Sequence, residues 1–578
     1  MNEYNNLNDD KQLILTPDKK RTRTRIIKCA AGTAAVAAVC AVSIAAVPQL
    51  RNSVKMAFSS PEDYFAGVLR SYALDNSGKA ADIYKKYCDS AEKEKSEKGT
   101  LIFEPGSEAA EDLGLKEGIK LGLDYNVSVK GSTAASTAGL SVDGNELIDV
   151  SAVAANDTFY LGFPTISPAW MYASAEDLRK EMLELTVSRR FAERPEITIL
   201  DGTVLTRERA ERITGRYTDI YLKYAGDVTI TKNREFTSQS GLTVKYNDAA
   251  VTLDTGELYD MCAEMLDAAK DDEDLLAVWN ACGYTSEEYD EYISDAIGSM
   301  GERPDGTEGK AEIHIYIGSD GKIKGQKLTL TSDGEDQNGF AELSSMLFVK
   351  GTEFAFEAAG NYESSYSYKD FDVSYSSDSA SKTELSLSGT YQKGKYSGSG
   401  KLTSESSNSY TSDDFNNSSG EAFNVDIEFS DVDGKALGSG SFDGSVKLSG
   451  GSVDVDDDYD DENVKFTVSL AGNENSADFA LEISEDDEKL FGLTVSAESA
   501  DYTEPEIPTE NIYSLLDDEE VKEYLRTVDM NKFRDNVENA RSALGDDFAD
   551  DLIEFADEIE EEFNDAREKG AAGGNINW

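Results

Sequence analysis

The residues that could carry out chemistry in this sequence are few, and the first to consider is its single histidine, His314. It lies in AEIHIYIGSDGKIKGQKLTL, where isoleucines occupy the alternate positions 313, 315 and 317. This alternation predicts a strand whose isoleucines face the core, so His314 points to the opposite, solvated face with Glu312 and Tyr316. A general base needs an oriented partner and a cleft, and no second histidine exists for a Ser–His or Cys–His pair. We therefore expect His314 to be structural.

An acidic run, DVDDDYDDEN, is the second candidate site. Asp456, Asp458 and Asp460 stand at alternate positions in it, and carboxylate oxygens are ligands that calcium prefers. The run lacks the turn glycine and the closing glutamate of an EF-hand, so a solvated acidic loop is the simpler interpretation and calcium the weaker one. The sequence contains no zinc-ligand cluster, phosphate-binding glycine loop or nucleophile-elbow motif. It predicts no catalytic residue and no cofactor.

The charge of the chain restricts its partners. Asp and Glu number 113 against 55 Lys and Arg, which gives a net charge of −58 at pH 7. A surface this negative repels the phosphates of nucleic acids and the headgroups of anionic lipids. The sequence therefore predicts no nucleic-acid partner.

The N-terminal segment predicts the location of the protein. The basic stretch KKRTRTRIIK leads into CAAGTAAVAAVCAVSIAAV, and residues 26–47 carry one charge, Lys28. At 1.5 Å per residue this length spans a bilayer core, which predicts a transmembrane signal anchor. The positive-inside rule places residues 1–25 in the cytoplasm as a basic lead and the rest of the chain outside the cell. We thus expect a single-pass cell-membrane protein with an extracellular C-terminal part; a cleaved signal peptide is the alternative.

The spacing of Cys262 and Cys282 leaves two interpretations open. The two residues lie in neighbouring predicted helices, so they either form a disulfide or are buried thiols.

Beyond the anchor, the hydrophobic pattern predicts a β-rich domain over residues 59–505. Helical insertions are expected near 60–95, 176–191 and 256–297, and strands near 217–232. The block from Lys310 to Ser499 holds no proline and repeats strict alternation, as in Phe466, Val468 and Leu470. Proline cannot donate to a sheet ladder, so its absence favours a long run of paired strands. One apolar and one solvated face are expected of this antiparallel sheet.

The C-terminal part predicts helices over residues 506–566 and a flexible tail over 567–578. Phe548, Leu552, Phe555, Ile559 and Phe563 form an apolar stripe that needs a surface to bury it. The simplest such surface is the apolar face of the sheet. The predicted fold class is therefore α+β: a large antiparallel sheet with helices packed on its apolar face, after one N-terminal transmembrane helix.

Two stretches carry a resemblance to known proteins. With the basic lead and the predicted span, SVDGNELIDVSAVAANDTFYLGFPTIS and IYIGSDGKIKGQKL resemble a group of uncharacterised single-pass membrane-anchored exported proteins of Gram-positive anaerobes. Their ectodomains resemble the lipoprotein-carrier (LolA/LppX-like) half-barrel. The resemblance implies a curved, half-barrel-like sheet around helices and a hydrophobic ligand between them. It implies no catalytic residues.

Three hypotheses about function follow. The favoured one is a membrane-tethered, extracellular, non-enzymatic binding or scaffold protein that holds a lipid or lipopeptide between sheet and helices. The second is a cell-surface adhesion or wall-associated protein that binds a cell-wall component. The third is a carboxylate-based hydrolase, which needs two carboxylates facing each other across a cleft. The oligomeric state is left open.

Overall fold

The computed structural model describes residues 59–569, except 92–93, 113, 131–132, 175–201, 302, 304–308, 334–336, 371–372, 413–414, 438–440, 455–463, 474, 486–487 and 505. The chain divides into two compact units, each assembled from separate stretches of sequence. Of the described residues, the first unit takes those up to 85 and those within 195–236 and 245–346. The second takes those within 86–194, 237–244 and 347–569.

The first unit combines helices with a short antiparallel sheet. Its elements are α3 (Pro61–Ala91), α6 (Arg207–Tyr224), β7 (Thr229–Thr237), β8 (Thr243–Asp254), α7 (Thr255–Lys270), α8 (Glu273–Ala281), α9 (Ser286–Met300), β9 (Gly309–Ile317), β10 (Ile323–Asp333) and β11 (Gln337–Lys350), some of which extend slightly past its bounds. β8, β9, β10 and β11 pair in that order. The isoleucines of β9 pack with Phe65 of α3 and Met261 of α7 in one hydrophobic core.

Side-chain caps fix where the helices of this unit begin. Asp254 and Glu257 form a reciprocal capping box at the start of α7, and Thr285 and Glu288 form another at the start of α9. Each box satisfies backbone N–H groups that have no partner within the first turn of a helix.

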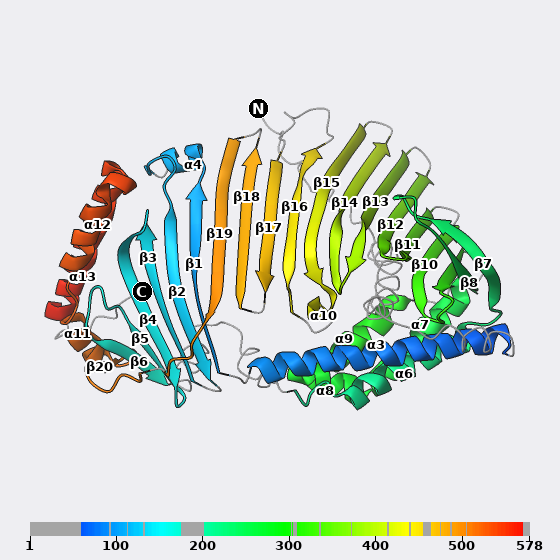
Figure 1. The fold of residues 1–578 in the computed structure, drawn as a ribbon, viewed down its shortest axis with the longest axis horizontal. Coiled ribbons are helices and arrows are strands. Elements are labelled where there is room, and N and C mark those ends of the chain that lie inside the picture. The colour runs from blue at the N-terminus through cyan, green and yellow to red at the C-terminus, as the bar shows by residue number, and fades with distance from the viewer. Residues whose placement is uncertain are drawn as a thin grey trace, which may run out of the picture. The chain divides into compact units, whose positions relative to one another are not determined.

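The second unit is built on a broad antiparallel sheet. Its strands are β1 (Lys95–Pro105), β2 (Leu121–Lys130), β3 (Thr133–Val142), β4 (Asn145–Ala155), β5 (Thr158–Gly162), β6 (Trp170–Ser174), β12 (Glu353–Asp370), β13 (Val373–Gln392), β14 (Lys395–Ser412), β15 (Phe415–Asp433), β16 (Gly444–Asp454), β17 (Val464–Asn473), β18 (Ser476–Glu485), β19 (Glu488–Ala500) and β20 (Ile512–Ser514). β12 to β19 pair in chain order, and β1 then joins β19 to the meander β2 to β6 (Figure 1). β20 lies parallel to β6.

Tight turns with positive φ angles connect several of these strands. Asp143 and Gly144, with φ of 47° and 80°, link β3 to β4, and Lys393 and Gly394, with φ of 53° and 91°, link β13 to β14. Two successive positive φ angles match the right-handed twist of a hairpin.

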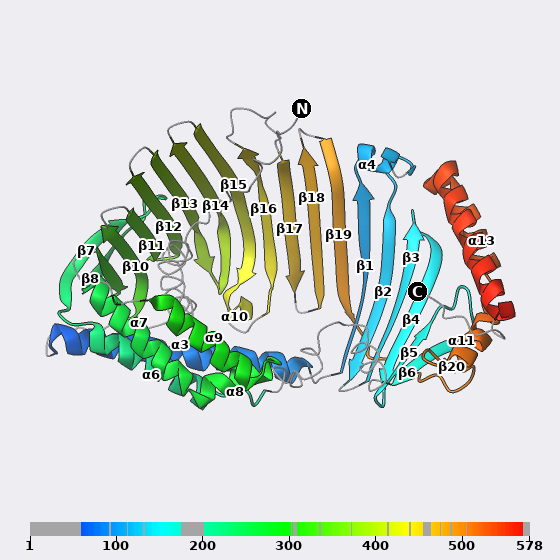
Figure 2. The same ribbon diagram turned by 180° about the vertical axis from the view of Figure 1, so that it is seen from behind.

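The second unit has five described helices, and the three C-terminal ones lie at one end of its sheet. The five are α4 (Ser107–Asp112), α10 (Gly434–Leu437), α11 (Asp518–Leu525), α12 (Asn531–Leu544) and α13 (Asp546–Lys569). α12 packs on β3 and β4, α13 packs on α12, and α11 packs on β6 and β20 (Figures 1 and 2). Their core includes Val142, Val537 and Leu544, all at most 1% exposed.

The predicted fold class, an α+β half-barrel with helices packed on its apolar face, is wrong. Twenty strands dominate the described residues. The described helices of the second unit pack chiefly on β3, β4 and β6, and only the short α4 and α10 adjoin β19 and β15. The alternation of residues defines two faces of a sheet but contains nothing about which parts of a face are covered.

The predicted membrane arrangement also needs correction. In the part of the chain that the structure describes, no helix has the length and apolar character needed to cross a membrane. The predicted span, residues 26–47, and the basic lead, residues 1–25, lie outside the described residues. The prediction of a single-pass cell-membrane protein with a transmembrane anchor is withdrawn on this finding.

Several smaller predictions can be compared with the structure. Helices occur as expected within 256–297, as α7 to α9, while 176–191 lies outside the described residues. Residues 217–224, predicted as a strand, form the end of α6. The helical insertion predicted near 60–95 corresponds to α3, and residue 95 already belongs to β1, because this strand pairs with β19 on one side and β2 on the other.

Candidate ligand-binding face

The register of β12 to β19 aligns apolar side chains, with some glycines between them, in rows across the sheet. In an antiparallel pair, residues opposite each other point to the same face, and so do residues two positions along a strand. The first row is Phe354, Gly389, Gly398, Phe429, Val446, Leu470, Phe479 and Val495. The second is Phe356, Leu387, Gly400, Ile427, Leu448, Val468, Leu481 and Leu493. The third is Ala358, Leu385, Leu402, Val425, Gly450, Phe466, Ile483 and Phe491. These three rows are called the apolar rows below.

Most side chains of the apolar rows are only partly buried. Val425 is 4% and Phe354 9% exposed. Leu448, Val468, Leu481 and their neighbours in the rows are partly exposed to solvent. The same face continues through β1 and β2 to Val142, which α12 helps to cover and which is 1% exposed. Among the described residues, the C-terminal helices that cover β3 and β4 thus have no counterpart over β16 to β19.

Aromatic side chains cluster beside a glycine at one end of the apolar rows. A Cβ atom added to Gly398 would lie 2.9 Å from the ring of Phe429, so this ring rests against the glycine backbone. Phe354 meets Tyr396 edge-on, with ring centroids 5.3 Å apart, and lies 6.1 Å from Phe429. Tyr391 lies 4.5 Å from Tyr396. The result is a cluster of aromatic rings at the distances and angles of favourable ring contacts.

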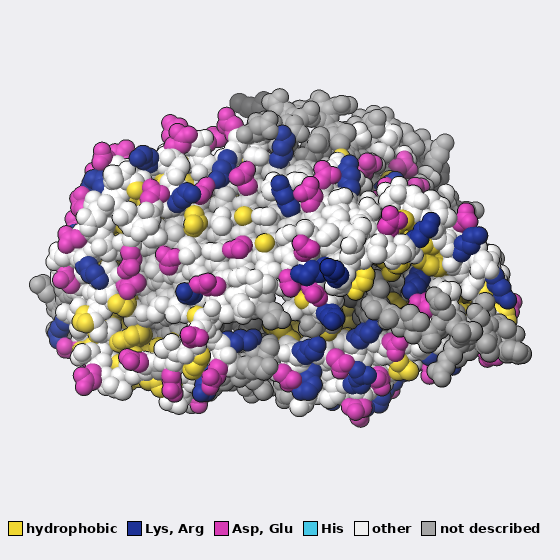
Figure 3. Space-filling view, in the orientation of Figure 1, with side chains coloured by type: hydrophobic (Ala, Val, Ile, Leu, Met, Phe, Trp, Pro, Cys, Tyr) yellow, Lys and Arg dark blue, Asp and Glu magenta, His cyan; other side chains and the backbone are white. Residues whose placement is uncertain are grey.

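The opposite face of the same strands is charged and polar. Lys98 and Glu498 form a salt bridge of 2.8 Å across β1 and β19, and Glu104 accepts from Lys489 at 2.7 Å and from Lys120 at 2.9 Å. Hydrogen bonds from these two lysines hold the pKa of Glu104 below its ordinary value. In Figure 3 the face turned to the viewer carries scattered charged side chains and few hydrophobic ones over β15 to β19, as expected of this face. The apolar face is therefore the one whose composition is unusual for this strongly charged protein.

His314 lies in the first unit, half-buried within an ionic cluster. Its Nδ1 atom lies 2.9 Å from a carboxylate oxygen of Asp248, whose other oxygen accepts from Arg234. Its ring stacks at 6.3 Å on Tyr316, which is itself buried. The expectation that this face of β9 is solvated is thus wrong, because β8 brings the buried Asp248 against it. Since Asp248 is already paired with Arg234, the arrangement is that of a structural cluster.

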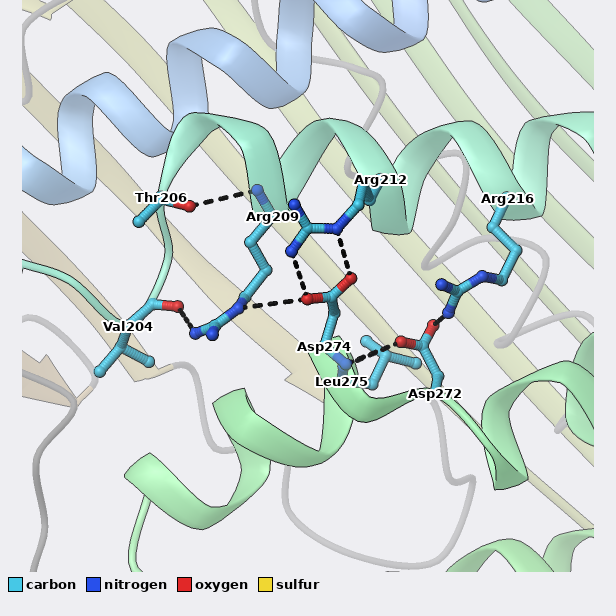
Figure 4. Close-up of polar contacts among 8 residues, drawn as sticks. All are labelled: Val204, Thr206, Arg209, Arg212, Arg216, Asp272, Asp274 and Leu275. Atoms are coloured by element: carbon cyan, nitrogen blue, oxygen red, sulfur yellow. Dashed lines mark hydrogen bonds and ion pairs between the residues drawn. The ribbon is translucent and has the colours of Figure 1, made fainter.

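A second ionic cluster joins α6 to the start of α8 (Figure 4). Arg212 binds Asp274 through two hydrogen bonds of 2.9 and 2.6 Å, and Arg209 lies 3.4 Å from the same carboxylate. Asp272 is 1% exposed; it pairs with Arg216 and caps α8 by accepting from the N–H groups of Asp274 and Leu275. Every carboxylate in this cluster is occupied by an arginine or a helix end. It holds two helices together and leaves no group available for chemistry.

The sequence reasoning missed this cluster because it assigned a strand to the end of α6. The signal was present: Thr206 is a helix cap, and Arg209, Arg212 and Arg216 recur at helical spacing.

The remaining predicted sites can be placed briefly. Asp456, Asp458 and Asp460 lie outside the described residues, so the calcium interpretation stays a prediction. Among the residues that are described, no group of three or more His, Cys, Asp or Glu side chains is arranged to hold a metal ion. Cys262 and Cys282 are not joined by a disulfide.

Comparisons with known proteins give no family. No protein-family model matches the chain, and no curated protein matches it. Two solved structures from Pseudomonas aeruginosa are similar in part: OccK5 (OpdH), with 5% identity, 70% of this chain and 96% of that chain covered and a TM-score of 0.15, and OccK8 (OprE), with 6% identity, 71% and 98% covered and a TM-score of 0.13. At such TM-scores neither bears on fold or function. The resemblance to lipoprotein carriers stays a prediction.

Proposed function

We propose that this protein is a non-enzymatic binding protein that holds the acyl chains of an uncharged lipid on the apolar rows of β12 to β19. One observation carries the proposal: three rows of mainly apolar side chains, interrupted by glycines on β13, β14 and β16, run across these strands and are only partly buried. Soluble proteins rarely leave a large contiguous apolar patch without a binding role for it.

The size of the apolar rows suits a lipid with two chains. With strands about 4.8 Å apart and alternate residues about 6.8 Å apart, the rows from β12 to β19 cover roughly 34 Å by 14 Å. Since the hydrocarbon core of a bilayer is about 30 Å thick and two chains deep, one acyl chain extends about 15 Å. Two chains end to end, or several side by side, fit the rows.

Charge favours an uncharged lipid over a second copy of the chain. The net charge is −58, so two copies brought face to face would repel each other, and an anionic headgroup would be repelled too. A neutral lipid is subject to neither of these electrostatic repulsions.

The hydrolase alternative receives no support from the carboxylates described above. Asp248 and Asp272, the two buried aspartates that the structure places in ionic clusters, each pair with an arginine. Each of the two carboxylates is therefore held by a cation, whereas a hydrolase needs two carboxylates facing each other across a cleft. Binding to a cell-wall component stays a prediction from the sequence.

A matched pair of substitutions on neighbouring residues tests the proposal. Val468→Glu places a charge in the centre of the apolar rows, whereas Thr467→Glu places the same charge on the opposite face of the same strand. The full chain is loaded with dioleoylglycerol, separated from unbound lipid by gel filtration, and its bound lipid is measured by mass spectrometry. Val468→Glu should lower retention at least about tenfold, because a charge in contact with hydrocarbon is costly, while Thr467→Glu should retain lipid like the unmodified chain.

Two results would contradict the proposal. One is equal retention by both variants. The other is an unmodified chain that binds no dioleoylglycerol and forms a dimer by light scattering that Val468→Glu dissociates, because the apolar rows would then bind a second copy.

A further inference from the structure

The apolar face changes character toward the far ends of β12 to β15. Beyond the third apolar row, the same face carries tyrosines at 362, 366 and 410 and hydroxyl or amide side chains at alternate positions of β13 and β14. Two cross-strand hydrogen bonds order this surface: Ser379 donates to Asn408 at 2.8 Å, and Thr383 and Ser404 lie 2.8 Å apart. The segment of this face on residues 360–366, 377–383, 404–410 and 419–423 is called the hydroxyl patch below.

The hydroxyl patch is almost free of charge in a strongly charged protein. Glu421 is its one charged residue among the positions just defined. The opposite face of the same strand segments carries Glu363, Asp378, Lys382 and Glu405, and no aromatic residue. Because both faces belong to the same strands, strand composition alone does not explain the difference. The tyrosines and the lack of charge are two separate features, and they coincide on the face that is continuous with the apolar rows.

The hydroxyl patch has the chemistry to bind an uncharged sugar. Tyrosines present flat apolar rings with a polar end, and a hydroxyl group offers one donor and two acceptors, so the cross-strand pairs keep hydrogen-bonding capacity for a ligand. Tyr366 and Tyr410 share a cross-strand row through Ser377 and stand two strands, or about 9.6 Å, apart. Tyr410 is 38% exposed. A polyhydroxylated ring could lie along this row and meet aromatic and hydroxyl groups together.

We infer that the ligand of this protein is a neutral glycolipid, whose acyl chains lie on the apolar rows and whose sugar headgroup lies on the hydroxyl patch. This inference rests on the function proposed above and adds the class of headgroup. The order of the two surfaces along the strands matches the order of the two parts of such a molecule. The negative charge of the protein disfavours the phosphate headgroups that would otherwise compete.

The test compares lipids that share their acyl chains and differ in the headgroup. The full chain is loaded separately with glucosyl-dioleoylglycerol, dioleoylglycerol and dioleoyl-phosphatidylglycerol, and the lipid retained after gel filtration is measured by mass spectrometry. The glucosyl lipid should be retained about tenfold better than dioleoylglycerol, the effect of one or two net hydrogen bonds, and phosphatidylglycerol least.

Variants locate the preference on the hydroxyl patch. Tyr366→Ser with Tyr410→Ser should abolish the preference for the glucosyl lipid and leave the retention of dioleoylglycerol unchanged. Ser365→Ala with Ser409→Ala, on the opposite face of the same two strands, is the control and should keep the preference. Far-UV circular dichroism checks that each double variant folds, and the comparison of lipids on the unmodified chain does not depend on any variant.

The outcomes separate this inference from the function on which it rests. If the unmodified chain retains dioleoylglycerol but shows no preference for the glucosyl lipid, the glycolipid inference fails and the proposed function stands. If it retains no lipid, both fail. If a soluble glucan without acyl chains competes as well as the glucosyl lipid, the hydroxyl patch binds sugars independently and the glycolipid inference is overturned.

Discussion

Asp272 offers the sharpest test of how the first unit is held together. Its carboxylate is 1% exposed, pairs with Arg216, accepts from the hydroxyl of Tyr217 at 3.2 Å, and caps α8 through two backbone N–H groups. Asp272→Ala removes all of these contacts together. Loss of the cap costs about 1 kcal/mol and the unpaired Tyr217 hydroxyl about 1 kcal/mol more.

The ion pair between Asp272 and Arg216 contributes less to the free energy of unfolding than a fully buried ion pair would. Arg216 is 39% exposed and regains water when its partner is removed, so we discount the 3–5 kcal/mol of a buried pair to about 1 kcal/mol. The total expected for Asp272→Ala is about 3 kcal/mol. Asp272→Asn keeps a capping oxygen and should cost about half as much. Glu273→Ala, an exposed neighbour, is the control and should cost less than about 0.5 kcal/mol.

Urea unfolding of the full chain, followed by tryptophan fluorescence, measures these differences because Trp279 lies on α8 itself. The buried cap and the ion pair would both be unimportant if Asp272→Ala unfolded within 0.5 kcal/mol of the unmodified chain. Equal losses for Asp272→Ala and Asp272→Asn would show that charge, and not capping, carries the effect.

Two further predictions concern pH. Because hydrogen bonds from its lysine partners lower the pKa of Glu104, the salt bridges stabilise the second unit fully above the ordinary glutamate pKa of about 4.3. This stabilisation is lost as the pH falls through the lowered pKa, so the urea midpoints of the unmodified chain and Glu104→Gln should differ at pH 7 and converge once Glu104 is protonated. A difference that persists at low pH would contradict this. Burial, with the charge of Asp272, raises the pKa of Tyr289 to about 12, so its stabilising effect is complete below the ordinary tyrosine pKa of about 10 and is lost as the pH rises toward 12. Tyr289→Phe, which loses the 2.6 Å hydrogen bond to the carbonyl oxygen of Ala269, should remove one tyrosine from the late part of an absorbance titration at 295 nm and cost about 1 kcal/mol at pH 7; a tyrosine lost instead from the part near the ordinary pKa of about 10 would show that Tyr289 ionises normally.

The sequence was sufficient to predict strands wherever local alternation was strong. Phe466, Val468 and Leu470 lie on β17 and point to one face, as expected. The local sequence pattern did not predict the correct element where contacts with residues distant in the sequence determine the secondary structure. The segment KSEKGT contains no apolar alternation, yet it forms β1 because strands from distant parts of the chain flank it. Tyr217, Ile220 and Tyr224 were read as part of a strand, but helical packing against α3 and α7 places them on α6.

The candidate site was predictable only in part. Each apolar run was visible in the sequence, but the alignment of the runs into rows depends on register. The number of turn residues and the bulges, such as the one at Tyr396 and Gly398, set that register. Which part of the apolar face the C-terminal helices cover depends on tertiary packing. The apolar stripe of α13 indicates that it must pack against something, and does not indicate where.

The pairing of β1 with β19 has a consequence for the order of assembly. Ser96 meets Ala500, so two neighbouring strands are separated by most of the translated chain. β12 to β19 are hairpin-connected and can form from local contacts, whereas β1 presents an open edge on the ribosome until the last third of the chain has emerged. The seam between β1 and β19 therefore closes late, and until then the newly made N-terminal strands have an unpaired edge that is open to aggregation and to chaperones.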